Sequence, residues 1–327
     1  MRVVSCNSFG PLEELAVEER PSRPLTAGEV RVEVRAAGVN FVDGLFVQGL
    51  YQVKPPTPFV PGGEVAGVVT EVGPDVGQWT VGQRVFASTG LGGFATEVVL
   101  PARMVLATPD ALTDGQAATF VQSYMTAWFA LHHRARAQAG QSLLVLGAGG
   151  GVGLAAVDVG RAMGLRVVAA ASSEAKRDVA IAHGAVATID IATEDLKDAA
   201  KAWAKAQGAG GVDLVYDPVG GSLAEAALRS LDDDGQYLVI GFAAGEIPKL
   251  PANQVLLRNR RVTGVDWGGW VGRHQEENRE MLGAVVAAIA AGALHPVEPK
   301  AYAFADVATA LRDQLERRVV GKSVLVP

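Results

Sequence analysis

The stretch Ser142–Gly153, SLLVLGAGGGVG, decides the fold of the second half of the chain. Its apolar residues 143–146 predict a central parallel strand that is covered on both faces. Five glycines follow between positions 147 and 153, where the backbone must turn tightly. Helical spacing over Leu154–Met163 then places the free N–H groups and positive dipole end of a helix directly after the loop. Strand, glycine loop and helix in this order are the context of a dinucleotide-binding fingerprint.

The loop departs from the strict G-x-G-x-x-G pattern, because Ala148 stands where the first glycine is expected. The residues that we expect beside a pyrophosphate are Ala148, Gly149, Gly150, Gly151, Val152 and Gly153. The alternative is a tight strand–helix turn without a ligand. A second strand at the expected distance favours the dinucleotide interpretation.

This second strand, Arg166–Ala171, indicates which dinucleotide is bound. It ends where an NAD-binding protein usually places an acidic residue for the ribose 2′-hydroxyl. Here two hydroxyls and two cations follow it instead, namely Ser172, Ser173, Lys176 and Arg177. These groups suit a 2′-phosphate and favour NADPH over NADH. Two alternatives stay open: Glu174 is close enough to contact a ribose, and the two cations are also typical of a solvated helix face.

Composition limits the class of protein. A chain of 327 residues suggests two domains, and 49% hydrophobic residues with 39 glycines fit an α/β protein. A net charge of −6 argues against a nucleic-acid partner. Cys6 is alone, so an intramolecular disulfide is impossible and a reducing compartment is expected. No leader is evident, and the apolar stretch near Gly283–Leu294 is shorter than the ~18 residues of a membrane span. We therefore expect a cytoplasmic protein without a membrane partner.

The pattern along the chain changes near residue 122. Before it, short strands such as Glu29–Ala37, with alternating valines, predict a partly closed barrel. After it, strands and helices alternate, as in a doubly wound parallel sheet. The expected parallel strands are 143–146, 166–171, 187–190, 214–217, 237–240 and 262–265. An amphipathic helix near Glu276–Ala291 follows, and the final strand Ser323–Val326 is expected to return to the first domain. The predicted domains are 1–122 with 267–327, and 123–266.

Several motifs together resemble a known family. They are AGVNFVD (37–43), PGGEVAGVV (61–69), GQRV (82–85), the glycine loop, DLVYDPVGG (213–221) and GKSVLVP (321–327). The chain is similar to the medium-chain dehydrogenase/reductase superfamily, in its zinc-free NADPH:quinone oxidoreductase (zeta-crystallin-like) branch. The resemblance covers nearly the whole length. It implies an α/β fold with a GroES-like partly open β-barrel domain plus a Rossmann-like doubly wound parallel sheet domain. It also implies hydride transfer from NADPH to a quinone or an α,β-unsaturated carbonyl.

The resemblance is to the branch without metal. Gly38–Phe41 occupies the stretch where zinc-dependent relatives carry a cysteine ligand, and Cys6 is alone. Glu64 is a possible remnant of a ligand set, although a structural hydrogen bond or charge contact is the preferred interpretation. We expect no metal site. The short-chain reductase class is also rejected, because no tyrosine of this chain is followed by lysine in a Tyr-x-x-x-Lys pair.

Catalysis without metal rests on positioning of the hydride donor and acceptor. The resemblance points to Asn40 in the cleft near the nicotinamide, and its alternative role is that of a turn amide. Tyr51 is the candidate phenol facing the substrate, and its alternative role is to anchor a loop through its ring. The chain has Leu45 and Phe46 where many relatives carry another tyrosine, so protonation by water is equally open.

Other cofactor positions are carried over from the family. Thr126 resembles a hydroxyl on the nicotinamide side, or is otherwise an ordinary helix residue. Arg317 resembles a tail arginine on the adenine phosphate side, or is otherwise one charge in a basic run. Loops after successive strands supply the rest, namely Asp217, Gly241, Phe242, Ala243, Asp266 and Trp267. Ile191 stands where some relatives have tyrosine near the adenine.

Two classes of function remain open. The first is an NADPH-dependent reductase of a small-molecule electrophile, a quinone or enone, with enoyl-thioester reduction as a variant. The variant would need a basic groove for coenzyme A phosphates, with Arg258, Arg260 and Arg261 as candidates. The second is a non-catalytic NADPH-binding protein. Relatives also suggest a homodimer formed through an edge strand near Val262–Asp266.

Overall fold

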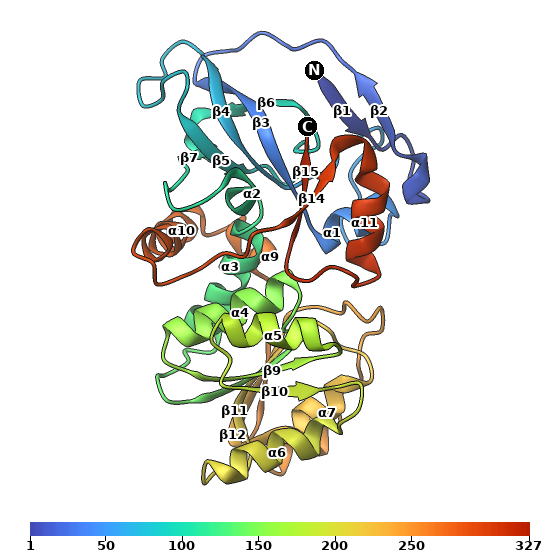
Figure 1. Cartoon of the computed structure of the whole chain (residues 1–327), viewed down its shortest axis with the longest axis vertical. Coiled ribbons are helices and arrows are strands. Elements are labelled where there is room, and N and C mark those ends of the chain that lie inside the picture. The colour runs from blue at the N-terminus through green and yellow to red at the C-terminus, as the bar shows by residue number, and fades with distance from the viewer. The chain divides into compact units, whose positions relative to one another are not determined.

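The computed structural model describes every residue from Met1 to Pro327 (Figure 1). The chain divides into two compact units. The first unit comprises Met1–Gln122 and Pro296–Pro327, and the second comprises Ser123–His295. Each unit has a sheet and a hydrophobic core of its own.

The first unit is built on a seven-stranded sheet in the order β14-β15-β3-β4-β5-β7, with β6 paired to β3. Its strands are β3 (Glu29–Val39), β4 (Glu64–Val72), β5 (Arg84–Ser88), β6 (Glu97–Pro101), β7 (Val105–Ala107), β14 (Lys300–Ala303) and β15 (Ser323–Val326). Val30, Val32 and Val34 of β3 are buried, as their alternation predicts. One edge of β3 pairs with β4, and the other pairs with β6 and then with β15. This sharing of one edge curves the sheet into the predicted partly open barrel.

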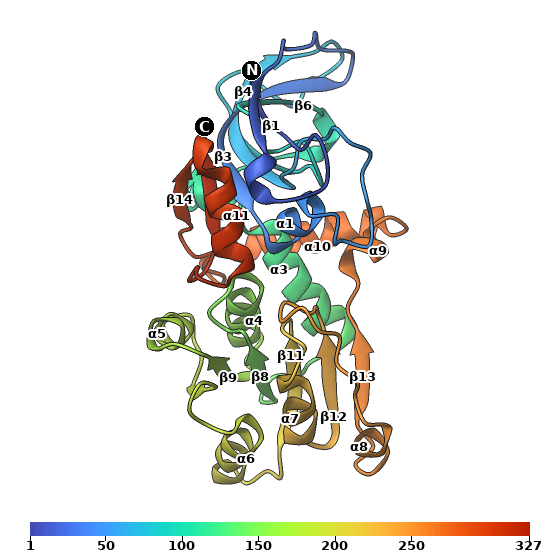
Figure 2. The same ribbon diagram turned by 90° about the vertical axis from the view of Figure 1, so that its right-hand side faces the viewer.

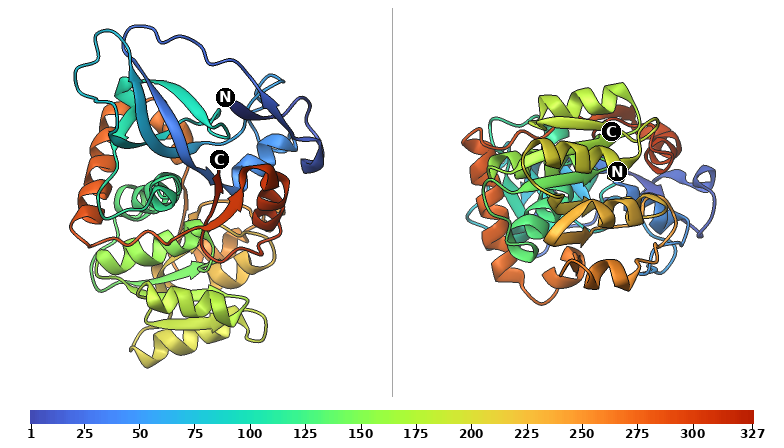
Figure 3. Two further views of the ribbon diagram at one scale, coloured as in Figure 1. Left: turned by 45° about the horizontal axis from the view of Figure 1, so that its top comes forward. Right: turned by 90° about the horizontal axis from the view of Figure 1, so that it is seen from below.

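Shorter elements complete the first unit. They are the antiparallel pair β1 (Arg2–Ser5) and β2 (Ala16–Glu19), the helices α1 (Phe41–Val47), α2 (Asp114–Ala117) and α11 (Val307–Leu315), and the 3₁₀ turns η1 (Leu12–Glu14), η2 (Ala102–Met104) and η4 (Phe304–Asp306). The C-terminal segment, red in Figure 3, lies beside the blue N-terminal strands and helix. Because β15 pairs antiparallel with β3, the tail strand returns to this unit as the sequence predicts.

The second unit contains a six-stranded parallel sheet in the order β10-β9-β8-β11-β12-β13 (Figure 2). Its strands are β8 (Ser142–Leu146), β9 (Arg166–Ala171), β10 (Ala187–Asp190), β11 (Val212–Asp217), β12 (Leu231–Val239) and β13 (Arg261–Gly264). Helices α4 (Gly151–Ala162) and α5 (Glu174–Ala182) lie on one face, and α6 (Leu196–Ala206) and α7 (Leu223–Ser230) on the other (Figure 1). In order of sequence the strands run 3-2-1-4-5-6, which is the doubly wound order expected for a dinucleotide-binding sheet.

The second unit contains five further helical segments. They are α3 (Val121–Trp128), which begins at the end of the first unit, the π-helix η3 (Phe129–Arg134), α8 (Ala252–Leu256), α9 (Trp267–Val271) and α10 (Gln275–Ala290). Residues 267–295 group with the second unit, whereas the sequence analysis placed 267–327 in the first. Ring contacts explain the difference, because Trp270 of α9 packs on Phe129 and His133 of η3.

Candidate functional site

The parallel sheet of the second unit brings most of the predicted cofactor residues to one edge. All its strands point the same way, so their carboxyl ends share an edge. The segments that follow these ends, in the spatial order of the strands, are Asp190, Ser172–Arg177, Gly147–Gly150, Asp217–Gly220, Gly241–Ala243 and Asp266. The strand order reverses between β8 and β11, and ligands of open α/β sheets bind at this switch point.

The glycine loop between β8 and α4 has the geometry of an anion cradle. Gly147 has a φ of 59°, which permits the sharp turn out of β8. A Cβ on Gly153 would lie 2.3 Å from the Gly147 carbonyl oxygen, so only glycine lets α4 approach the strand this closely. Gly150 is the N-cap of α4 and has no capping side chain, and the first turn carries no acidic residue. The N–H groups at this helix end are therefore suited to a phosphate.

The segment after β9 carries two serines and two basic residues. Ser172 and Ser173 are exposed, and Ser173 is the N-cap of α5 without a side-chain capping bond. Lys176 lies against the glycine loop, since a Cβ on Gly149 would come within 2.4 Å of its Cβ. Arg177, however, is paired with Asp190 at 3.0 Å and donates to the Ala171 carbonyl. Its charge is thus partly neutralised within the protein.

Asp217 organises the next loop from a buried position. Its Oδ1 accepts hydrogen bonds from the N–H groups of Val219 (2.7 Å) and Gly220 (2.9 Å). Its Oδ2 accepts the phenol hydrogen of Tyr237. Burial, followed by the neighbouring Asp217 carboxylate, raises the pKa of Tyr237 above its ordinary value. The Asp217 carboxylate therefore stabilises the conformation of its own loop. The backbone of this loop lies at the carboxyl edge of the sheet.

The loops after β12 and β13 are also fixed by hydrogen bonds. Ala243 donates its N–H to the Pro218 carbonyl at 3.0 Å, which joins its loop to the one after β11. Asp266 caps α9 by accepting from Gly269 N at 2.9 Å. Trp267 donates its indole N–H to Asn278 of α10 at 2.9 Å. Asp266 and Trp267, the two residues predicted here from the family resemblance, therefore also stabilise the start of α9.

Thr126 lies half-buried in α3, a helix anchored at Tyr124. The Tyr124 hydroxyl donates to the buried Asp158 carboxylate of α4 at 2.8 Å. The same carboxylate accepts from Arg161 (2.7 Å) and from the backbone N–H of His295 (2.6 Å). Asp158 therefore fixes α3 and the end of the second unit to α4.

In the first unit, Asn40 lies at the start of α1 inside a buried cluster of charges. Its amide nitrogen Nδ2 donates to Glu64 Oε2 at 2.8 Å, and its Oδ1 accepts from the Lys322 ammonium. Its backbone N–H donates to Asp43 Oδ2 at 2.7 Å. The second oxygen of Glu64 accepts from the N–H of Gln122 at 2.9 Å. Asn40, Asp43, Glu64 and Lys322 are all buried, so this cluster is held away from bulk water.

Burial shifts the titration of two members of the cluster. It raises the pKa of Asp43 to about 7; the Glu64 carboxylate acts in the same direction, while N–H donors and Lys322 oppose the rise. Burial also lowers the pKa of the Lys322 ammonium, against the attraction of Glu64 and Asp43. The cluster is therefore sensitive to the charge of each member.

Tyr51 and Arg317 also belong to the first unit. The Tyr51 ring packs against Phe46 of α1, with 4.7 Å between ring centroids, which is the loop-anchoring contact given above as its alternative role. Arg317 follows α11 with a φ of 59° and is exposed.

Of the three arginines that the sequence offers for a thioester substrate, Arg260 is buried, whereas Arg258 and Arg261 are exposed. Arg260 is buried and donates to the carbonyls of Gln254, Arg229 and Leu231, so it binds the ends of neighbouring elements. Arg258 pairs with Asp233 at 3.1 Å. Arg261 donates to the Asp234 carbonyl.

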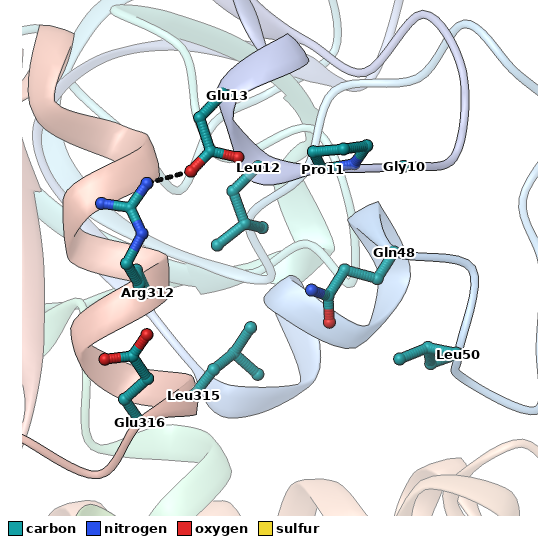
Figure 4. A pocket seen from close by; sticks show the side chains of 9 residues that line it. All are labelled: Gly10, Pro11, Leu12, Glu13, Gln48, Leu50, Arg312, Leu315 and Glu316. Atoms are coloured by element: carbon teal, nitrogen blue, oxygen red, sulfur yellow. Dashed lines mark hydrogen bonds and ion pairs between the residues drawn. The ribbon is translucent and has the colours of Figure 1, made fainter.

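A pocket in the first unit is lined by none of these residues, although Leu50 and Glu316 of its lining directly precede Tyr51 and Arg317. It is lined by Gly10, Pro11, Leu12, Glu13, Gln48, Leu50, Arg312, Leu315 and Glu316. Figure 4 shows the Arg312–Glu13 ion pair between α11 and η1 beside it. No residue that the sequence assigns to catalysis or to the cofactor lines this pocket.

Comparison with known proteins identifies the family. Residues 26–110 match the alcohol dehydrogenase GroES-like domain, and residues 151–287 match the zinc-binding dehydrogenase domain. The chain is 36% identical to quinone oxidoreductase-like protein 2 of Bos taurus, over 95% of this chain and 88% of the relative. The Thermus thermophilus quinone oxidoreductase is 33% identical with a TM-score of 0.84, and the Escherichia coli quinone oxidoreductase complexed with NADPH is 26% identical with a TM-score of 0.87. Both matches cover 100% of each chain.

The chain therefore belongs to a class of oxidoreductases. This class is the medium-chain dehydrogenase/reductase superfamily. Within it, the chain falls in the quinone oxidoreductase branch, as the sequence motifs indicate. The expected fold, a GroES-like barrel with a Rossmann-like parallel sheet, is confirmed.

The name of one matching domain raises the question of zinc. The structure places no group of three or more His, Cys, Asp or Glu side chains so that they could hold a metal ion. Beside Asn40 and Glu64 stands the ammonium of Lys322, which repels a divalent cation. None of the helices is long and apolar enough to cross a membrane.

Two features of the site escaped the sequence analysis. Lys322 lies within the GKSVLVP motif, but its approach to Asn40 depends on the pairing of β15 with β3, between residues 282 positions apart. The sequence predicts only a strand at Tyr237, and the bond of this residue to Asp217 depends on the parallel pairing of β11 and β12.

Proposed function

We propose that this protein is a zinc-independent reductase that transfers a hydride from NADPH to a quinone or an α,β-unsaturated carbonyl. The observation that carries the proposal is the carboxyl edge of the second unit, where an open glycine cradle adjoins two exposed serines and Lys176. Relatives solved with NADPH, such as the Escherichia coli and Thermus thermophilus enzymes, support the choice of cofactor.

Each part of the edge has a task in this proposal. NADPH supplies the hydride when it is bound. The N–H groups of the glycine loop and of the first turn of α4 bind its pyrophosphate, and Ser172, Ser173 and Lys176 bind its 2′-phosphate. The loop of Gly241–Ala243 and the start of α9 flank the nicotinamide end.

Asn40 and Tyr51 are the proposed substrate-side groups. Addition of a hydride to a carbon of the acceptor places negative charge on its oxygen, and a positioned N–H or O–H donor stabilises that charge. A proton from water then completes the reduction, giving a hydroquinone or a saturated carbonyl. The zinc-free character of the proposal is supported by the donor set around Asn40, which includes a lysine.

The proposal includes a cytoplasmic homodimer. Strand β13 is an edge strand with Val262 exposed. Leu256, the last residue of α8, and Leu257, its C-cap, are exposed as well. An unpaired edge of this kind can add a second copy of itself.

Steady-state oxidation of NADPH and NADH tests the function. The acceptors are 1,4-benzoquinone, 9,10-phenanthrenequinone, a small enone and crotonyl-coenzyme A. We expect turnover with NADPH and with quinones or the enone. Preference for the thioester would favour the enoyl reductase, and NADPH binding without turnover of any acceptor would favour a binding protein.

A further inference from the structure

The side-chain amide of Asn40 is held between two buried groups of opposite charge. Its Oδ1 accepts from the ammonium of Lys322, which comes from β15 at the C-terminus. Its Nδ2 donates to the carboxylate of Glu64, the first residue of β4, at 2.8 Å. Glu64 is itself fixed by the Gln122 N–H at 2.9 Å. The amide oxygen therefore has a positively charged partner, and the amide nitrogen has a negatively charged one.

This arrangement permits a single orientation of the amide. A rotation of 180° would place the Nδ2 hydrogens against the Lys322 ammonium, which only donates hydrogen bonds. It would also place Oδ1 against the Glu64 carboxylate, which in its ionised form only accepts them. Each mismatch leaves a buried polar group without a partner, which disfavours the flipped orientation.

One hydrogen of the amide is left over. Nδ2 carries two hydrogens, and Glu64 accepts one of them. No protein atom of the structure accepts the second. The ammonium on Oδ1 also polarises the amide by drawing electrons from nitrogen toward oxygen. Hydrogen bonds in such a chain strengthen one another, so the second N–H becomes a better donor.

We propose that Glu64 and Lys322 are positioning residues that lock the Asn40 amide so that its second N–H donates to the substrate oxygen during reduction. The inference rests on the proposed function, because it assumes that Asn40 faces the substrate. It adds Glu64 and Lys322 to that function. Together these two residues make the neutral Asn40 amide a fixed and polarised hydrogen-bond donor.

The kinetic test is a double-mutant cycle. Lys322→Met removes the charge while keeping a chain of similar length, and Asn40→Ala removes the amide. We expect Lys322→Met to lower kcat about 10-fold or more, with the KM for NADPH unchanged, as expected when an oxyanion donor is weakened. Asn40/Lys322 double substitution should be no slower than Asn40→Ala alone, because lysine acts through the amide. Lys322→Arg should restore part of the rate.

A matched control separates this effect from a general loss of charge. Lys300→Met removes an exposed lysine of β14 in the same unit, and its kcat should equal that of the wild type. Glu64→Gln should also lower kcat, because a neutral amide at position 64 weakens the preference for one orientation of Asn40. Unchanged kcat in Lys322→Met, or fully additive losses in the cycle, would overturn the proposal.

A second readout is independent of turnover. In protein labelled with ¹⁵N at asparagine, Asn40→Asp assigns the side-chain resonances of Asn40. Lys322→Met should shift these resonances and speed exchange of their hydrogens, while those of Asn278 should not move. If the wild type reduces no acceptor but this shift is seen, the proposed function fails and the locked amide stands. If Asn40 resonances are unchanged, the locking is wrong whatever the activity.

Discussion

At the scale of single residues, the buried carboxyl of Asp43 controls how the stability of the first unit responds to pH. Its pKa is raised from an ordinary value of 3.8 to about 7 by burial. The folded protein therefore holds a proton that the unfolded chain releases between these values. The contribution of Asp43 to stability is full below pH 3.8 and is lost as the pH rises through about 7.

Asp43→Asn should remove this dependence while keeping an acceptor for the Asn40 N–H. We expect the free energy of unfolding of the wild type to fall, relative to the variant, by at most about 1.4 kcal/mol per pH unit between pH 5 and pH 7. Urea unfolding at several pH values measures it. Parallel curves for the two proteins would show that Asp43 does not titrate in this range.

Lys176 and Arg177 are neighbours with different expected effects on NADPH. Arg177 is already paired with Asp190 at 3.0 Å, whereas Lys176 lies against the glycine loop. Lys176→Ala should weaken NADPH binding about 10- to 100-fold, which corresponds to the loss of a charge-assisted hydrogen bond, and should leave NADH nearly unaffected. Arg177→Ala should weaken NADPH binding less. Fluorescence titration gives both dissociation constants, and a larger loss in Arg177→Ala would contradict the assignment.

At the scale of elements, two glycines of the same loop should behave differently. A Cβ on Gly153 would lie 2.3 Å from a carbonyl oxygen, whereas a Cβ on Gly150 meets nothing closer than 3.5 Å. Gly153→Ala should therefore destabilise the fold by about 1–3 kcal/mol through overpacking. Gly150→Ala should cost at most about 1 kcal/mol as a poorer N-cap but weaken NADPH binding about 10-fold or more.

Thermal unfolding and NADPH titration on these two variants separate packing from binding. Gly283→Ala in α10, where a Cβ meets open space, is the control for a general effect of the substitution. Normal NADPH affinity in Gly150→Ala would show that the backbone at this position does not approach the cofactor.

The elements that the sequence predicts well are those with strong local patterns. The valine alternation of β3 and the apolar run of β8 both determine a strand, and the glycines after β8 determine the turn. Short elements such as α1 were missed, because seven residues carry too little periodicity. The start of β12 was missed because its sequence LDDDG is typical of a loop. Only Leu231 of this stretch pairs with β11, and the register shifts before pairing resumes at Gln236.

The candidate site likewise contains some residues that local sequence patterns predict and others that they do not. The glycine loop and Ser172–Arg177 could be predicted because each lies within a few residues of a recognisable strand. The bonds of Glu64 and Lys322 to Asn40 could not, because they join segments that only sheet pairing brings together.

At the scale of the whole molecule, the exposed edge of the second unit predicts association of two copies. Leu256 and Leu257 are 76% and 70% exposed beside the edge strand β13. Replacing both with glutamate should convert a dimer into a monomer, because two buried charges would face their copies across the axis. Sedimentation velocity measures the change. Val81→Glu, at an exposed site of the first unit, is the control, and a dimer that persists in the leucine variant would place the interface elsewhere.

The central claim is that the carboxyl edge of the second unit is an NADPH site that recognises the 2′-phosphate. The measurement that tests it most directly is a titration of the wild-type protein with NADPH and with NADH, followed by intrinsic fluorescence. The account predicts a dissociation constant at least about 10-fold lower for NADPH. Equal affinities for the two, or tighter binding of NADH, would contradict it.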